Sequence, residues 1–341
     1  RRLCLNYFRM TCVKIARASA PAKIMLFGEH FVVYGCPSIL GSIDKRVSVT
    51  AKQTESAKIN INSNMGFLAS YSSESLDKPG PQFSEAQNTL YPIYAAVHDV
   101  LKDHFEVDGR HHGVEIDIKS DIPWGAGLGS SAASCVATVG AVKSLFLKPE
   151  KEWVYSRALG AERIIHENSS GADCNISTFG GLIYYIKDTR NKKISSKAEL
   201  SLVVLITGIK HSTRSQVSFV KNFRNQNRSL FNDLANRATR VCDKAVSAIR
   251  SGDIIKLGEL MNENHMLLKD LGVSNDEIND LIRFCLDNGA TGAKLTGAGG
   301  GGSVVALLSN ENQASFVRKL GKKGFRQFFP VRISSYGLLI E

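Results

Sequence analysis

The alternation of apolar and polar residues predicts strands along the whole chain. Short runs in which every second residue is apolar are typical of strands with one face in a core, and short continuous apolar runs suit fully buried strands. Segments of these two kinds occur at residues 12–18, 23–27, 46–50, 57–61, 114–118, 182–186, 202–206, 293–296 and 303–308, and two more strands are expected near the end of the chain.

Apolar residues spaced three or four apart predict helices between these strands. From Ser130 onward they stand at 132, 133, 136, 139, 142 and 146, which is one face of a helix. Further helices are expected at residues 151–167, across 230–270 as two helices broken near Ser251-Gly252, at 276–287 and at 315–321. Because strands and helices are mixed without a regular βαβ alternation, the predicted fold class is α+β.

Two polar segments are expected to lie outside this framework. Residues 69–88 are rich in Ser, Pro and charge, which predicts a surface loop. The polar stretch DTRNKKISSK at 188–197 is interpreted as a hinge between two domains, residues 1–190 and 191–341. A length of 341 residues suits two domains of ordinary size.

Composition and charge narrow the class of protein. Apolar residues make up 43% and charged residues 22%, as in ordinary globular proteins, and no apolar run approaches the roughly 18 residues of a membrane span. Seven scattered cysteines without a C-x-x-C pair predict neither disulfides nor a zinc site and suit the cytoplasm. The basic segment Arg1–Phe8 faintly resembles a transit peptide, and an extension before a start at Met10 explains it better.

The net charge of +11 suits an anionic partner. Nucleic acid, an anionic membrane surface and small anionic substrates all meet this description. Basic residues cluster only in short stretches, without an arginine-rich tract or a stacked aromatic motif, so a nucleic-acid site gains no support beyond charge. A generally basic surface that attracts a nucleotide and a carboxylate is the simpler interpretation.

Two glycine-rich segments are the first candidates for chemistry. Residues 125–131, GAGLGSS, stand directly before a predicted helix, where glycines and a helix start offer backbone N–H groups to an anion. The segment is not a Walker loop, because no Lys follows the last Gly, and not a dinucleotide fingerprint, because Ser130 replaces the third Gly. A phosphate cradle and a tight connection both explain it. Between two strands, five of the six residues 297–302 are glycine, an excess that favours backbone packed against a ligand.

A few charged residues accompany these segments. Glu162 lies on the flank of a predicted helix, and Asp173 follows in a turn just before a strand. Phosphoryl transfer needs an acid to hold Mg²⁺ and often a second to accept the hydroxyl proton, although a solvated Glu and a turn-forming Asp explain the pair equally simply. Lys23 enters an apolar strand and needs an anionic partner. Glu29 and His30 end that strand, where a lone His is more often structural than catalytic.

In series, three segments resemble the motifs of the galactokinase, homoserine kinase, mevalonate kinase and phosphomevalonate kinase (GHMP) superfamily. They are PAKIMLFGEHFVVYG from Pro21, PWGAGLGSSAA from Pro123 and KLTGAGGGG from Lys294, and the resemblance spans residues 20–308. The segment FVVYG after GEH, and ERIIHENSSGADCNISTFGG at 162–181, are similar to the mevalonate kinase branch. The chain departs from the usual pattern at Ser169, where Pro is common, and at Trp124 and Ala22.

The resemblance implies a two-domain α+β fold with ATP in a cleft between the domains, and phosphoryl transfer from Mg²⁺-ATP to the C5 hydroxyl of mevalonate. Asp173 would be the base or orient this hydroxyl, with Lys23 stabilising the ionised carboxylate. Glu162 and Ser131 would hold Mg²⁺. The remaining implied site residues are Lys23, Asn64, Ser120, Gly125, Ala126, Gly127, Leu128, Gly129, Ser130 and Ser131 toward ATP, and Glu29, His30, Asp173, Thr213, Gly297, Ala298 and Gly299 toward mevalonate.

Three alternatives stay open. Another small-molecule kinase of the superfamily, such as a phosphomevalonate kinase or a sugar kinase, would carry similar motifs. A catalytically dead relative is disfavoured because Lys23, Ser131, Glu162 and Asp173 are all present. A nucleic-acid-binding protein would need salt-sensitive binding, and no motif supports it. The expected partners are therefore mevalonate and ATP, with no nucleic acid and no membrane, in a cytoplasmic protein whose oligomeric state is open to a homodimer.

Overall fold

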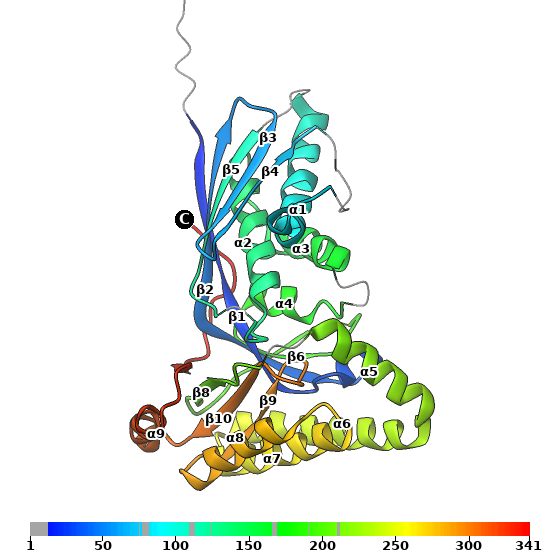
Figure 1. The fold of residues 1–341 in the computed structure, drawn as a ribbon, viewed down its shortest axis with the longest axis vertical. Helices are drawn as coiled ribbons and strands as arrows, with labels where there is room; N and C mark the ends of the chain where they lie inside the picture. The colour runs from blue at the N-terminus through cyan, green and yellow to red at the C-terminus, as the bar shows by residue number, and fades with distance from the viewer. Residues whose placement is uncertain are drawn as a thin grey trace, which may run out of the picture.

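The computed structural model describes residues 13–74, 76, 82–108, 113–123, 125–165, 169–189, 191–209 and 212–341. In these ranges the chain forms two sheets with helices packed against them (Figure 1). The strands are β1 (Ile15–Phe27), β2 (Ser38–Thr54), β3 (Lys58–Ser63), β4 (Phe67–Ser72), β5 (Gly113–Ser120), β6 (Leu182–Tyr185), β7 (Lys192–Ile194), β8 (Ser201–Ile206), β9 (Gly292–Thr296), β10 (Ser303–Leu308), β11 (Phe328–Val331) and β12 (Leu339–Ile340). The helices are α1 (Glu85–Asp108), α2 (Ser130–Ser144), α3 (Lys151–Ile165), α4 (Ala172–Phe179), α5 (Thr213–Gln226), α6 (Arg228–Ser251), α7 (Ile254–Asp270), α8 (Asp276–Asp287) and α9 (Asn310–Lys322), with a 3₁₀ turn η1 (Phe31–Tyr34).

The first sheet contains eight strands among the described residues, in the order β12-β1-β2-β5-β3-β4, with β6 paired to β2 and β7 to β6. Its pairs are antiparallel except for β3 with β5. Helices α1, α2 and α3 lie together on one face (Figure 1). From Ala18 onward every residue of β1 is buried, because α2 covers this strand and, farther along, α7 and β9 contact it as well.

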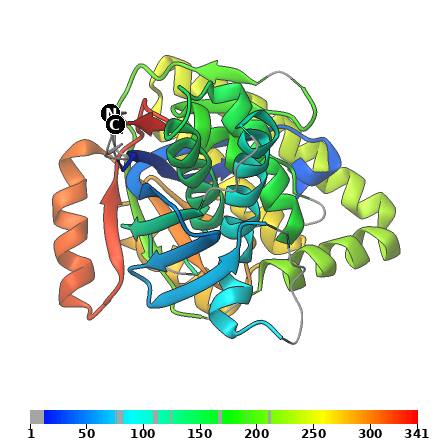
Figure 2. The same ribbon diagram turned by 90° about the horizontal axis from the view of Figure 1, so that it is seen from above.

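The second sheet has the antiparallel order β11-β8-β10-β9. Helix α7 packs on β9, α8 on β9 and β10, and α9 on β8 and β11. Helix α9 lies at one side of the molecule, and the pair α5 and α6 projects from the opposite side (Figure 1, Figure 2). Helices α6 and α7 are separated as predicted, because Gly252 has a left-handed φ of 77° and the Asp253 side chain caps α7. No helix in the described ranges is long and apolar enough to cross a membrane.

Most predicted strands and helices are confirmed, with three corrections. The two runs at 12–18 and 23–27 belong to one strand, β1, with a register shift between Pro21 and Lys23. Residues 69–88 are not all loop, since β4 ends within this stretch and α1 begins there. The two elements pack on each other, as Tyr71 of β4 stacks on Tyr94 of α1 with ring centroids 4.2 Å apart. Helices α1, α4 and α5 were not predicted.

The division at 188–197 stays a proposal. The second sheet and helices α5 to α9 all come from residues after 200, as expected for a separate domain. Two strands of the second half nevertheless pair within the first sheet. Strand β7, which lies in the predicted hinge, pairs with β6, and β12 pairs with β1. We therefore propose domains 1–190 and 191–341 that share strands at their junction.

Candidate active site

The two glycine-rich segments, far apart in the sequence, lie against each other. We call residues 125–131 the first glycine loop and residues 297–302 the second glycine loop. A Cβ on Gly297 would lie 3.2 Å from the carbonyl oxygen of Gly127. The hydroxyl of Ser303, directly after the second loop, donates to the Ala126 carbonyl at 2.7 Å. The loops therefore form one surface made largely of backbone.

The first glycine loop ends at the start of α2. Gly125, Gly127 and Gly129 all have φ near +70°, a region that favours glycine. Gly129 is the N-cap residue of α2 and provides no side-chain cap, so the first N–H groups of the helix are not closed off by such a bond. Unpaired N–H groups at a helix start attract anions. Ser131, in the first turn, is exposed beside them.

Lys23 and Asp173 form an ion pair beside this loop. The Lys23 Nζ and Asp173 Oδ1 atoms are 3.1 Å apart, and the side chains are 6% and 29% exposed. The Lys23 N–H donates to the Leu128 carbonyl at 2.9 Å, which ties β1 to the first glycine loop. A Cβ on Gly129 would lie 2.7 Å from Lys23 Cγ and 3.6 Å from Asp173 Oδ2. The absence of a side chain at Gly129 thus leaves room for the pair.

Asp173 lies in a helix, which corrects the predicted turn before a strand. Gly171, with φ of 79°, starts the helix α4, and β6 begins only at Leu182. The aspartate therefore stands in the first helical turn, where the helix dipole stabilises a negative charge. Tyr185 holds the preceding segment by donating a hydrogen bond to the Ser170 carbonyl. These contacts fix the backbone of the aspartate.

Glu162 is buried next to this pair, and so is not a solvated helical glutamate. Its Oε2 accepts a hydrogen bond from the Cys174 thiol, with Sγ 3.0 Å away. Burial raises the pKa of Glu162 to about 7, Asp173 adds to the rise, and hydrogen bonds from Cys174 and Ser169 and the charge of Lys23 oppose it. Two carboxylates therefore share a region with one lysine, an arrangement that a bound cation would stabilise.

The donors near the first glycine loop suit a hard cation. Carboxylate and hydroxyl oxygens, here from Glu162 and Ser131, are ligands that Mg²⁺ takes, and it often completes its shell with water and substrate phosphates. In the described part of the chain, no group of three or more His, Cys, Asp and Glu side chains gathers as a metal site. A cation would therefore need a phosphate-bearing ligand to be held here.

Both carboxylate oxygens of Glu29 are bound by side chains of the protein. Its side chain is fully buried and pairs with the equally buried Lys294 of β9. Asn264 Nδ2 donates to the other carboxylate oxygen at 3.2 Å, and Lys294 also donates to the Leu295 carbonyl at 2.6 Å. Burial lowers the pKa of Lys294, while Glu29 acts in the opposite direction. The implied contact of Glu29 with mevalonate stays a prediction.

The end of β1, just before Glu29, is joined to β9 by two hydrogen bonds. The Met25 N–H donates to Thr296 Oγ1 at 3.1 Å, and that hydroxyl donates to the Met25 carbonyl at 3.0 Å. His30 has φ of 62°, a strained value for a residue with a side chain. Burial lowers the pKa of His30, so the neutral ring donates from Nε2 to the Ala298 carbonyl at 2.8 Å. His30 thereby connects β1 to the second glycine loop.

The remaining implied residues have contacts of their own. Asn64 and Ser120 bond each other, from Asn64 Nδ2 to the Ser120 carbonyl at 3.3 Å and from the Ser120 N–H to Asn64 Oδ1 at 3.0 Å. Thr213 is exposed at the first position of α5. Gln216 on the same helix lies so close to Gly300 that a Cβ there would collide with its amide. Roles for Asn64, Ser120 and Thr213 stay predictions.

The sequence-based reasoning missed Lys294 and Cys174. Lys294 stands in an apolar strand, and the argument that a lysine there needs an anion, which was applied to Lys23, would have found it. Cys174 gives no such signal, because a buried cysteine is usually a small apolar residue. The hydrogen bond between Cys174 and Glu162 is apparent only in the folded chain.

Comparison with known proteins places this arrangement in a class. The model for the GHMP kinases N terminal domain matches residues 91–181, which include the first glycine loop, Glu162 and Asp173. The model for the GHMP kinases C terminal matches residues 245–326, which include Lys294 and the second glycine loop. The chain belongs to the GHMP kinases, and its fold is that of this family.

Individual relatives show which kind of GHMP kinase this chain is similar to. The mevalonate kinase of Pyrococcus abyssi is 38% identical over 340 residues, covering 96% of this chain and 98% of that protein. The structure of Methanococcus jannaschii mevalonate kinase matches with a TM-score of 0.79 and 28% identity, over 93% of this chain and 98% of that one. L. major mevalonate kinase in complex with R-mevalonate matches with a TM-score of 0.75 and 29% identity, over 95% and 96%. The chain belongs to the mevalonate kinase family.

Proposed function

We propose that this chain transfers the γ-phosphoryl group of ATP to the C5 hydroxyl of mevalonate, giving 5-phosphomevalonate and ADP. The observation that carries the proposal is the Lys23–Asp173 pair, 3.1 Å apart beside a helix N-terminus that is built to take phosphate. The full-length similarity to proteins named mevalonate kinase supports mevalonate as the acceptor.

The proposal assigns each residue a step that its geometry supports. Asp173 is 29% exposed, so an acceptor hydroxyl can reach its carboxylate, while Lys23 holds that carboxylate in place. As the hydroxyl oxygen bonds to the γ-phosphorus, Asp173 orients it and accepts its proton. The bond from the γ-phosphorus to the β–γ bridging oxygen breaks, and ADP leaves with the electron pair. The Lys23 ammonium and the N–H groups of the first glycine loop stabilise the negative charge.

A magnesium ion is part of this proposal. Glu162 and Ser131 would hold it, as oxygen ligands of the type it prefers. When bound, Mg²⁺ would neutralise charge on the β- and γ-phosphates. The protein's own contribution is to bury Glu162 beside Asp173, which keeps both carboxylates near the phosphate-binding helix start.

The acceptor side and the location of the protein are also proposed. Mevalonate would lie against Asp173, His30, Thr213 and the second glycine loop, and the nucleoside toward Asn64 and Ser120. A cytoplasmic location is supported by the cysteines of the described chain, namely Cys36, Cys135, Cys174, Cys242 and Cys285, which are all free thiols.

A coupled ADP-release assay tests the proposal. The purified chain is given Mg²⁺-ATP with mevalonate, 5-phosphomevalonate, galactose or homoserine, and the product is identified by ³¹P NMR. We expect kcat/KM to be highest with mevalonate and the product to carry phosphate on C5. Higher kcat/KM with another acceptor would replace mevalonate as the substrate, and no turnover with any would refute the assignment.

A further inference from the structure

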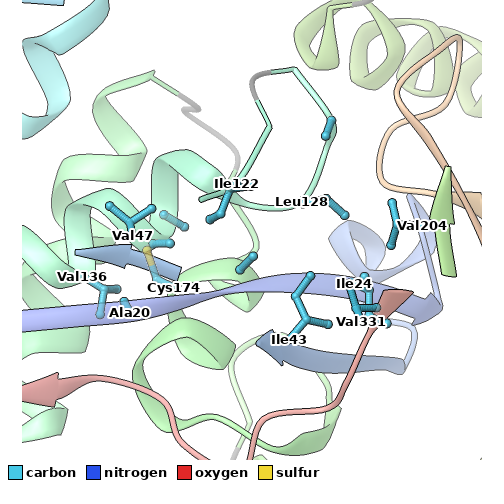
Figure 3. Close-up of a cluster of buried hydrophobic side chains, with 14 of the residues drawn as sticks. Ala20, Ile24, Ile43, Val47, Ile122, Leu128, Val136, Cys174, Val204 and Val331 are labelled. Carbon is cyan, nitrogen blue, oxygen red and sulfur yellow. The ribbon is translucent and has the colours of Figure 1, made fainter. Parts of the chain in front are cut away.

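Cys174 follows Asp173 directly in the sequence but faces a different environment. Its side chain is fully buried in α4, in a cluster of apolar side chains that includes Ala20, Val47 and Val136 (Figure 3). At the polar edge of that cluster, Sγ lies 3.0 Å from Glu162 Oε2. The Cys174 side chain therefore packs in the apolar core and, through its thiol, contacts the Glu162 carboxylate beside the active site.

The hydrogen bond from Cys174 is important because the Glu162 carboxylate is buried. A carboxylate removed from water is costly unless hydrogen-bond donors replace the lost water, and Glu162 also has the like charge of Asp173 nearby. In this bond the Cys174 thiol is the donor and the Glu162 carboxylate oxygen the acceptor. Glu162 in this position depends on such donors.

We propose that Cys174 is a positioning residue that fixes the Glu162 carboxylate for binding the metal–nucleotide complex. The proposal rests on the proposed function, because it assumes that Glu162 is a ligand of Mg²⁺. It goes further in assigning control of the metal ligand to a thiol that does not touch substrate. Loss of an outer hydrogen-bond partner of a metal ligand weakens metal binding without removing the ligand itself.

Two substitutions separate the hydrogen bond from packing. Cys174→Ala removes the donor, and Cys174→Ser keeps a donor of nearly the same size. Cys285→Ala is the matched control, because Cys285 is a free, fully buried cysteine on α8 of the second half. For each protein we would measure the melting temperature, the Kd of ATP with Mg²⁺ and with EDTA, and Mn²⁺ binding to the protein–ATP complex by EPR.

We expect Cys174→Ala to raise the Kd of Mn²⁺ in the ATP complex by about tenfold. The Kd of ATP in EDTA and the KM for mevalonate should stay unchanged, and Cys174→Ser should restore the metal affinity. Unchanged Mn²⁺ affinity in Cys174→Ala would overturn the proposal. Equal losses in Cys174→Ala and Cys174→Ser, or a fall in melting temperature without a metal effect as in Cys285→Ala, would assign Cys174 to packing alone.

The readouts also keep the two proposals apart. If the wild-type chain does not phosphorylate mevalonate but its Mn²⁺ affinity still depends on Cys174, the proposed substrate fails and the positioning role stands. If mevalonate is phosphorylated and Mn²⁺ binding is indifferent to Cys174, the positioning role fails alone. Should Cys174→Ala not fold, Cys174→Val removes the donor while filling the space, and the same comparison with Cys174→Ser applies.

Discussion

Two lysine–carboxylate pairs, one at Lys23 within β1 and one at Glu29 just after this strand, have opposite surroundings. In the Lys23–Asp173 pair the carboxylate is 29% exposed. In the Lys294–Glu29 pair both side chains are 0% exposed, and Asn264 and a backbone carbonyl occupy further positions around the charges. The same two chemical groups thus form a pair that we propose to be catalytic where one face is left open, and a structural pair where every side is covered.

The difference follows from which elements meet β1. Lys23 contacts the first glycine loop and α4, which present a backbone carbonyl and one carboxylate. Glu29 contacts β9 and α7, which surround it with donors. A buried carboxylate whose partners are all protein groups contributes to the stability or the specificity of the fold. A carboxylate with an oxygen that remains accessible can accept a proton from a substrate.

The largest effect is expected from neutralising the open pair. Asp173→Asn should lower kcat by about 10²–10⁴-fold, the usual contribution of a general base, because the amide cannot accept the hydroxyl proton. Its melting temperature should stay near that of the wild type. The steady-state ADP-release rate measures the effect, and Asp280→Asn, on the exposed face of α8, is the control. Near-normal turnover would remove Asp173 from its role.

Breaking the covered pair should act on stability instead. Lys294→Met leaves the Glu29 carboxylate buried without its cation, which should cost about 3–5 kcal/mol of unfolding free energy. Urea denaturation followed by circular dichroism measures this cost. The double variant Glu29→Gln/Lys294→Met should recover part of it, because no unpaired charge remains. A single variant as stable as the wild type would show that the pair is not structurally important.

Crowding the open pair should have a smaller effect. Gly129→Ala places a Cβ 2.7 Å from Lys23 Cγ and so should displace the ammonium from Asp173. It also adds the cost of a left-handed residue, about 1–2 kcal/mol. Gly324→Ala is the control, because it has the cost of a left-handed residue without a clash. At Gly324 φ is +85° and nothing lies within 4 Å of the added Cβ. We expect both to lower stability, Gly129→Ala the more, but only Gly129→Ala to lower kcat, by about tenfold or 1.4 kcal/mol; equal kcat values would contradict this.

The smallest effect concerns acid stability near the covered pair. His265, whose Nε2 is 3.1 Å from Asn279 Oδ1, has its pKa lowered from 6.5 to about 4, mainly by burial, with Lys294 and Lys269 contributing. The unfolded chain therefore binds the proton more readily, and stability falls as pH drops from 6.5 toward 4. The cost should be roughly 1 kcal/mol by about pH 5.5. Urea unfolding at several pH values should show a shallower dependence for His265→Gln, and an identical slope would exclude His265 as the cause.

The sequence predicted the parts of the molecule whose signals are local. The short apolar runs at β8 and β10 and the Ser251-Gly252 break appear in the fold where the sequence placed them. Helix α1 was missed because its apolar positions follow a polar, proline-containing stretch, and α4 was missed because eight residues carry too little periodicity. The environments of Glu29 and Glu162 could not be predicted, because burial depends on Lys294 and Cys174, which lie far along the chain or in another helix.

The paired bonds between Met25 and Thr296 have a mechanical consequence. They lie between Lys23 and the Glu29–Lys294 pair, so β1 is attached to both sheets within a few residues. A hinge needs a short segment that can rotate at low cost, and here rotation would break two hydrogen bonds and separate buried charges. We therefore expect this junction to be stiff, so that the two halves of the chain move little relative to each other around β1.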